Sequence, residues 1–405
     1  MAHPPDAVRR RRELDLLRIF ACLVQFPFHT AKVFDFDPAY HVKSAVASGA
    51  MDLFAAFAHV WRMPLFFFIA GFAAATALSS RRSFPFVVDR FVRLLPPFVV
   101  GLLLFAPAIK YLERLGGIDL RPSGLRPVEV PFTLDYVDFY YRFFTRLNQF
   151  TWSHLWFLAY LLLFSLIFTW AIRRIALAYD RWPGHGGWLV LPGLALAAAE
   201  VLLRPRFGDL PNLFGDFANL AIETVFFFMG AIVSRQPRIE AVLTVRPLLL
   251  LGLGLGSFGF YYLGEAAFGP WALGARGLAA WCLVLGLLGL GRRLTRRETA
   301  FDRYMGEASL PLYVLHHLPV VAIAFVLVPL DLPLWVKAAA ICFGSAAVTF
   351  AAYHLVIRPY GPVRFLFGLK PRRHRPAPGM NVHSGVRTQS GGKVQSGSKV
   401  QAARE

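Results

Sequence analysis

Long apolar stretches alternate with short basic segments along most of this chain. A membrane-spanning helix needs about 20 mostly apolar residues. The candidate stretches lie at 14–33, 51–79, 91–113, 153–172, 188–203, 218–234, 247–265, 273–291, 309–328 and 334–357. The pattern predicts an all-α polytopic membrane protein with about ten transmembrane helices in one bundle, contained within residues 14–360.

Two segments outside this bundle have a different character. Residues 1–13 are rich in arginine. From about residue 370 the chain is first basic and proline-rich and then repeats Ser, Gly, Lys, Val and Gln. Such a composition cannot bury enough apolar area to offset the entropy lost on ordering. We therefore expect a cytoplasmic basic N-terminus at 1–13 and a disordered, basic cytoplasmic tail at 370–405.

Composition and charge support a membrane protein and indicate which classes of partner to expect. Hydrophobic residues make up 56% of the 405 residues and charged residues only 17%, whereas soluble domains carry about 25% charged residues. The formal net charge is +19, and arginines cluster between the apolar stretches, as at Arg81–Arg82 and Arg173–Arg174. Cytoplasmic loops of membrane proteins show this bias. We expect contact with the lipid bilayer, no nucleic-acid partner, and both termini in the cytoplasm.

One glycine motif needs a structural explanation. Gly254, Gly256 and Gly259 form the pattern G-x-G-x-x-G, which binds dinucleotides only between a strand and a helix. Here the motif lies inside the apolar stretch 247–265. Small residues of this kind let transmembrane helices approach closely, so we expect a helix-packing role.

The first span carries ionisable residues where they are costly. Arg18 and His29 are eleven residues apart, which on a helix is three turns plus about 20° and a rise of about 16 Å. Both side chains should therefore lie on one face, with His29 near the middle of the membrane. Asp15 is spaced to pair with Arg18, and Pro27 should kink the helix. Ionisable groups at this depth indicate function.

Two further arginines begin the third span. Arg90 and Arg93 lie one turn apart in the segment DRFVRLLPP. Together with Arg18 they would form a guanidinium cluster at the cytoplasmic face, and guanidinium forks match phosphate groups. The alternative is that Arg90 and Arg93 anchor the helix at the membrane surface and that Arg18 extends to the lipid headgroups.

Other polar residues also interrupt the apolar stretches. The further candidates are His59, Arg62, His154, Glu223, His316, His317 and His354. His316 and His317 are adjacent, and neighbours on a helix point 100° apart, so at most one should face a polar interior. No histidine spacing typical of a metal site is present, and no metal is expected.

Several segments together resemble the acyltransferase 3 family of bacterial membrane O-acyltransferases. The matching segments, in order, are LDLLRIFACLVQFPFH, MPLFFFIAGF, RFVRLLPP, HLWFLAYLLLFSL and LPLYVLHHLPVV. They cover residues 13 to 360, and the fourth and fifth are most similar to the glucan biosynthesis protein C branch. The family typically has ten spans. Arg18 and His29 fill its R-x10-H motif, and Arg90 and Arg93 fill its R-x-x-R motif.

The resemblance implies an O-acyltransferase of the bacterial inner membrane. Acyl-CoA, as acetyl-CoA or succinyl-CoA, would come from the cytoplasm, and the acceptor would be a hydroxyl of an extracytoplasmic carbohydrate such as a glucan. Arg18, Arg90 and Arg93 would hold the CoA phosphates. His29 would act as general base, and His317 would polarise the thioester carbonyl or hold the sugar.

The rival function is transport. A transporter or flippase without acyl-transfer chemistry would also place ionisable residues at mid-membrane depth. Inverted repeats would favour that function, and the sequence shows no clear repeat.

Overall fold

The computed structural model describes residues 11–121, 124–127, 132–146, 148–178, 186–295 and 297–370. The described residues form one compact unit. Of the two predicted flanking segments, 1–13 is described only at 11–13, and 370–405 only at its first residue. The rest of both segments lies outside the described residues.

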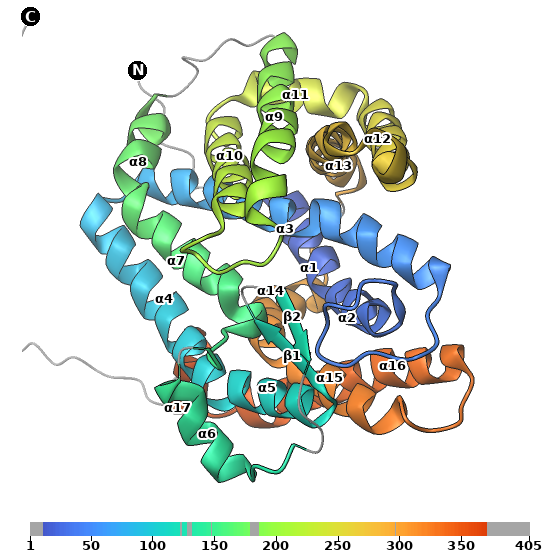
Figure 1. The fold of residues 1–405 in the computed structure, drawn as a ribbon. Helices are drawn as coiled ribbons and strands as arrows, with labels where there is room; N and C mark the ends of the chain where they lie inside the picture. Colours follow the sequence, from blue (N-terminus) through green and yellow to red (C-terminus); the bar gives the residue numbers. More distant parts are fainter. Residues whose placement is uncertain are drawn as a thin grey trace, which may run out of the picture. The chain divides into compact units, whose positions relative to one another are not determined.

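The described chain is helical apart from one short hairpin (Figure 1). The helices of the first half are α1 (Arg12–Leu23), α2 (Gln25–Phe34), α3 (Gly49–Leu78), α4 (Ser83–Leu104), α5 (Ala106–Leu115), α6 (Tyr136–Thr145), η1 (Ser153–Leu155), α7 (Trp156–Ile167) and α8 (Thr169–Leu177). Those of the second half are η2 (Gly186–Leu189), α9 (Val190–Phe207), α10 (Phe217–Val233), α11 (Pro237–Val245), α12 (Pro247–Phe268), α13 (Pro270–Leu294), α14 (Ala300–Leu315), α15 (His317–Leu327), α16 (Leu334–Ala352), the π-helical turn η3 (Tyr353–Ile357) and α17 (Gly361–Leu366).

Nine of the predicted spans coincide with helical segments of the right length and polarity. Six described helices are long and apolar enough to cross a membrane, and the number rises to nine when each of three bent pairs counts as one span. The bent pairs are η1–α7 with α8, α10 with α11, and α14 with α15. The first predicted span, 14–33, is formed by α1 and α2, which have 12 and 10 residues. A count of ten therefore stays a prediction.

The predicted kink in the first span falls one turn before Pro27. A proline has no N–H, so Pro27 cannot donate to the carbonyl of Leu23 four residues earlier. The structure accordingly ends α1 at Leu23 and begins α2 at Gln25. Val24 still donates to Phe20, and Phe28 donates to Val24, each at 3.0 Å. The two helices therefore continue one another across the break.

Helix α3 is the central packing element. It contacts α1 and α2 as well as α8, α10 and α13 (Figure 1). Its contact with α10 depends on two glycines that face each other's backbone. A Cβ on Gly71 would lie 1.8 Å from the carbonyl oxygen of Phe227, and a Cβ on Gly230 would lie 1.9 Å from that of Phe68. Only glycine fits at either position.

The G-x-G-x-x-G segment lies within α12, as the apolar stretch predicts. Gly254 packs against α13, because a Cβ there would lie 2.7 Å from the side chain of Leu283. A Cβ on Gly256 or Gly259 would meet no atom of the described chain within 4 Å. The helix-packing role is therefore confirmed for Gly254 but not for the other two glycines.

Segments predicted to share one side of the membrane contact each other. On the predicted cytoplasmic side, Arg173 donates to the carbonyl of Arg81 at 2.5 Å, and Arg293 donates to that of Thr244 at 2.8 Å. Hydrogen bonds thus join turns on this side that are distant in the chain.

The opposite side is joined in the same way. Trp152 donates to the carbonyl of Pro211 at 2.9 Å, and Tyr262 donates to the carboxylate of Asp52 at 2.7 Å. A two-stranded antiparallel hairpin, β1 (Ile118–Arg121) and β2 (Gly124–Pro127), follows α5 on this side, with Leu120 paired to Leu125. These contacts agree with the alternating topology that the apolar pattern predicts.

Candidate active site

A helix break places both adjacent histidines in the interior. Helix α14 ends at Leu315, α15 begins at His317, and the two helices meet at a bend of 51°. His316 is 1% exposed and His317 is 3% exposed. The expectation that at most one of them would face the interior is therefore wrong, because it assumed an unbroken helix.

Five histidines meet at this break. The ring of His317 lies 4.3 Å from that of His29, 4.8 Å from that of His154 and 5.0 Å from that of His41. His316 lies 5.0 Å from His29 and 5.1 Å from His154. We call these five residues the histidine cluster. The structure thus brings together His29 and His317, which are 288 positions apart in the chain, and turns His29 away from the lipid.

Tyr40 joins the two predicted catalytic histidines. It lies in the loop between α2 and α3 and is 5% exposed. Its hydroxyl is 3.3 Å from Nδ1 of His29 and 3.3 Å from Nε2 of His317. A phenol has one proton to donate, so it can donate to only one of the two rings and must accept from the other.

His41 has a carboxylate partner. Its Nδ1 donates to Oε2 of Glu113 at 2.6 Å, and Glu113 is fully buried. The other carboxylate oxygen accepts from Nζ of Lys110 at 2.5 Å and from the backbone N–H of Leu120 at 2.6 Å. This network fixes the carboxylate and leaves Nε2 of His41 as the nitrogen that can accept a proton.

The hairpin completes this buried charge network. Asp119, on β1, lies 2.9 Å from Lys110 and 2.6 Å from both Arg114 and Arg121. Burial would raise the pKa of the Asp119 carboxyl, but hydrogen bonds from Arg121 and Lys110 outweigh it and lower this pKa. The carboxylate therefore stays charged and helps to hold Lys110 against Glu113.

Two other histidines donate to backbone carbonyls near the helix break. Nδ1 of His316 donates to Tyr313 at 2.7 Å, and Nε2 of His154 donates to Val314 at 3.0 Å. Their remaining ring nitrogens are buried with no hydrogen-bond partner in the described part of the chain, as is Nδ1 of His317. Buried ring nitrogens of this kind can form a hydrogen bond with a bound ligand.

Arg62 of α3 lies beside the cluster with unused donors. Its guanidinium carbon lies 3.5 Å above the ring of Phe28, and the residue is 4% exposed. Its Nε and Nη1 atoms are buried and bond to none of the described residues. The ring of Phe28 packs edge-on against His29 at 4.9 Å. A buried guanidinium with free N–H groups is suited to stabilise negative charge that develops nearby.

The three arginines predicted to bind phosphate lie on two helices that both contact α14. Arg18 pairs with Asp15 at 2.9 Å, as its spacing predicts, and donates to the carbonyl of Gly306 on α14 at 3.3 Å. Arg90 lies over the ring of Phe86 at 4.9 Å, and Arg93 is exposed. Both belong to α4, which packs against α14 as α1 does. Arg18 and the Arg90–Arg93 pair thus lie on two helices that flank a third.

Three members of this site could hardly be recognised from the sequence. Tyr40 and His41 follow the first span in a loop, and Glu113 sits at the edge of the third predicted span. The available signal was the pair Lys110 and Glu113, two charged residues within one apolar stretch.

Among the described residues, no group of three or more His, Cys, Asp or Glu side chains is arranged to hold a metal ion.

Comparison with known families matches most of the chain. The family model described as "Acyltransferase domain" matches residues 11–354. This range contains the whole histidine cluster and the three predicted phosphate-binding arginines.

Curated relatives agree with that match. The chain is 24% identical over 336 residues to a protein of Escherichia coli (strain K12) named "Glucans biosynthesis protein C". It is 25% identical over 345 residues to the protein of the same name from Escherichia coli O1:K1 / APEC. Each alignment covers 77% of this chain and 83% of the relative. No solved structure matches the chain.

Proposed function

This chain belongs to the acyltransferase domain family, and from that premise we propose that it is a membrane-bound O-acyltransferase acting on a carbohydrate. The donor is acyl-CoA, with an acetyl or a succinyl group. The acceptor is a hydroxyl of an extracytoplasmic carbohydrate such as a glucan, a class suggested by the names of the relatives. The protein resides in the bacterial inner membrane with both termini in the cytoplasm.

The observation that carries this proposal is the position of His29. Its imidazole lies in the interior of the helices, 4.3 Å from the ring of His317, and both rings contact the hydroxyl of Tyr40. A neutral imidazole has one ring nitrogen that can accept a proton. A positioned general base of this kind typically accelerates a reaction by about 10²–10⁴-fold.

In the proposed reaction His29 removes the proton from the acceptor hydroxyl. The hydroxyl oxygen attacks the thioester carbonyl carbon, and the carbonyl oxygen becomes negatively charged. Arg62, with its unused N–H groups beside Phe28, stabilises that oxyanion. The intermediate then collapses, the C–S bond breaks, and the proton held by His29 passes to the sulfur of CoA. The products are the acyl ester and CoA as a thiol.

The donor enters from the side of the basic turns. Arg18, Arg90 and Arg93 bind its phosphates on either side of α14, and the pantetheine arm extends toward the break between α14 and α15. His317, at that break, orients the thioester carbonyl or the sugar. Guanidinium groups provide forked donors suited to phosphate oxygens.

A transfer assay tests the proposal. Purified full-length protein is incubated with labelled acetyl-CoA or succinyl-CoA and a linear β-glucan oligosaccharide, and label on the oligosaccharide is measured. We expect transfer by the natural protein and none by His29→Ala. The matched control is His354→Ala, which removes an exposed histidine from η3, and both variants should unfold at the temperature of the natural protein.

Two outcomes would overturn parts of the proposal. Full transfer by His29→Ala would remove His29 as the base. Absence of transfer with either donor, together with movement of labelled oligosaccharide across vesicles containing the protein, would replace the acyltransferase with a transporter.

A further inference from the structure

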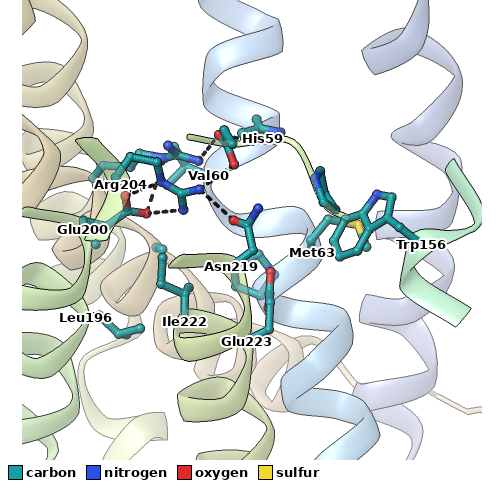
Figure 2. A pocket seen from close by; sticks show the side chains of 16 residues that line it. His59, Val60, Met63, Trp156, Leu196, Glu200, Arg204, Asn219, Ile222 and Glu223 are labelled. Carbon is teal, nitrogen blue, oxygen red and sulfur yellow. Dashed lines mark hydrogen bonds and ion pairs between the residues drawn. The ribbon is translucent and has the colours of Figure 1, made fainter. Parts of the chain in front are cut away.

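A second polar cluster lies outside the histidine cluster. It surrounds a cavity of about 40 Å³ between α3, α9, α10 and α13 (Figure 2). That volume holds a few water-sized groups. Its polar lining comes from His59, Glu200, Arg204, Asp209, Asn219, Glu223 and Arg276.

Both arginines of this cavity are already paired with carboxylates. Arg204 lies 2.9 Å from Glu200 and 2.8 Å from Asp209, and Arg276 lies 2.6 Å from Asp209. His59 is 3.0 Å from the same carboxylate. Both guanidinium groups that line the cavity therefore face carboxylates, so neither is available to an anionic ligand. The cavity suits a neutral polar group.

Asp209 holds the arginines in place. It lies in the loop between α9 and α10. Burial would raise the pKa of its carboxyl, but the charges of Arg276 and Arg204 outweigh burial and hold this pKa well below its usual range. The Asp209 carboxylate therefore stays charged and pairs with both arginines.

Two polar side chains on α10 remain without a full set of partners. Asn219 is 8% exposed and Glu223 is 5% exposed. Nδ2 of Asn219 and Oε2 of Glu223 are buried, and no described residue bonds to either atom. Arg204 donates to Oδ1 of Asn219 at 2.9 Å, and because arginine can only donate, this bond fixes Nδ2 as the free amide donor. Leaving such groups unpaired is costly.

The two unpaired atoms lie one helical turn apart on α10. Figure 2 shows both side chains between Arg204 on one side and Met63 and Trp156 on the other. A hydroxyl group can accept from the Asn219 amide and form a hydrogen bond with the Glu223 carboxyl group at once. An aromatic wall with a few directed polar groups is the usual form of a small-molecule site.

The cavity is adjacent to the histidine cluster and opens away from the basic turns. His59 stacks on Phe28 at 6.1 Å, and Phe28 packs against His29 at 4.9 Å, so one ring separates the two sites. The side chains of His59 and Asp209 are 41% and 35% exposed. They form the mouth beside the 208–216 loop, which is the extracytoplasmic side in the predicted topology.

We propose that this cavity binds an anchoring hydroxyl or hydroxymethyl group of a polyhydroxylated sugar acceptor, so that a different hydroxyl of the same sugar reaches His29. The inference rests on the proposed acyltransferase function and assigns its acceptor subsite. Asn219 and Glu223 bind the anchoring hydroxyl, Trp156 contacts the apolar face of the sugar, and Arg204 positions Asn219.

Acceptor kinetics test the assignment. The Glu223→Leu variant should raise the KM for a linear β-glucan oligosaccharide by about tenfold, which is the loss expected for one buried hydrogen bond. The KM for acyl-CoA should not change. Glu265→Gln, which alters an exposed glutamate at the end of α12, is the matched control and should leave both values unchanged.

A binding measurement without donor separates this inference from the proposed function. Titration of the protein with the same oligosaccharide should change the tryptophan fluorescence, and the signal should disappear in Trp156→Phe. In Glu223→Gln, which preserves the shape of the side chain, the apparent Kd should rise several-fold. An unchanged Kd and an unchanged acceptor KM in both Glu223 variants would overturn the acceptor subsite, even if the natural protein transfers acyl groups. Normal binding without any transfer would instead overturn the proposed function.

Discussion

His41 donates from Nδ1 to Glu113 across 2.6 Å, although the two residues are 72 positions apart and neither belongs to a recognised motif. The carboxylate is fully buried and is held by Lys110 and by the backbone of Leu120. A carboxylate that accepts from one nitrogen of an imidazole fixes the tautomer and the orientation of the ring. Within the histidine cluster, His41 is the member whose ring bonds to a carboxylate of the described chain.

His41→Gln should lower the turnover number without destabilising the protein. The substitution removes the imidazole but leaves the Lys110–Glu113 ion pair. We expect kcat to fall by about 10²-fold if His41 assists proton transfer, with an unchanged unfolding temperature. Glu113→Gln should also lower the unfolding temperature, because breaking a buried ion pair costs about 3–5 kcal/mol. Natural kcat in His41→Gln would show that the pair is structural only.

Arg62→Met tests the proposed oxyanion contact. The variant keeps an unbranched side chain over Phe28 but removes the unused N–H groups. Loss of one oxyanion donor typically lowers kcat by about 10²–10³-fold, and we expect little change in either KM. Arg206→Met, at the exposed end of α9, is the control. A change confined to the acceptor KM would instead place Arg62 in the acceptor subsite.

Arg90→Ala and Arg93→Ala should each raise the KM for acyl-CoA. The guanidinium groups are proposed to contact its phosphates, so an acyl-pantetheine donor, which lacks the nucleotide, should bind the variants and the natural protein equally. Initial rates at varied donor concentration provide the measurement. If only acceptor kinetics change, the phosphate-binding role is wrong.

Gly71→Ala should destabilise the contact between α3 and α10. The added methyl group would lie 1.8 Å from the carbonyl of Phe227, and overpacking of this kind typically costs about 1–3 kcal/mol or more. Thermal unfolding in detergent should show a clear decrease in Tm. Gly256→Ala, on α12, where an added methyl group would meet no described atom within 4 Å, should leave Tm unchanged or slightly raise it. Equal Tm values for the two variants would show that the close contact between α3 and α10 at Gly71 contributes little to stability.

The order and approximate limits of the spans were predictable because a span is recognised from the length of a single apolar stretch. No information about its neighbours in space is needed. The pairing of Arg18 with Asp15 was predictable for the same reason, since both lie on one helical turn. Family resemblance was also readable from the segments around His29, Arg90 and His317, and the match to residues 11–354 confirms it.

Features that depend on two distant segments were not predictable in this way. The contact between His41 and Glu113 requires a loop after α2 to meet the end of α5, and no local pattern encodes that meeting. The inward position of both His316 and His317 follows from a bend that a regular helix lacks. The polar cavity combines residues of five helices and the loop after α9. Of its charged and histidine residues, only His59 and Glu223 stood out in the sequence.

Tyr40 connects two imidazoles through a single hydroxyl, and this makes their proton positions interdependent. When the O–H bond points toward His29, Nδ1 of that ring accepts, and Nε2 of His317 must supply a proton to the phenol oxygen. Reversal of this arrangement requires the O–H bond to rotate and both rings to change tautomer. A single hydroxyl therefore couples the tautomer of each histidine to that of the other.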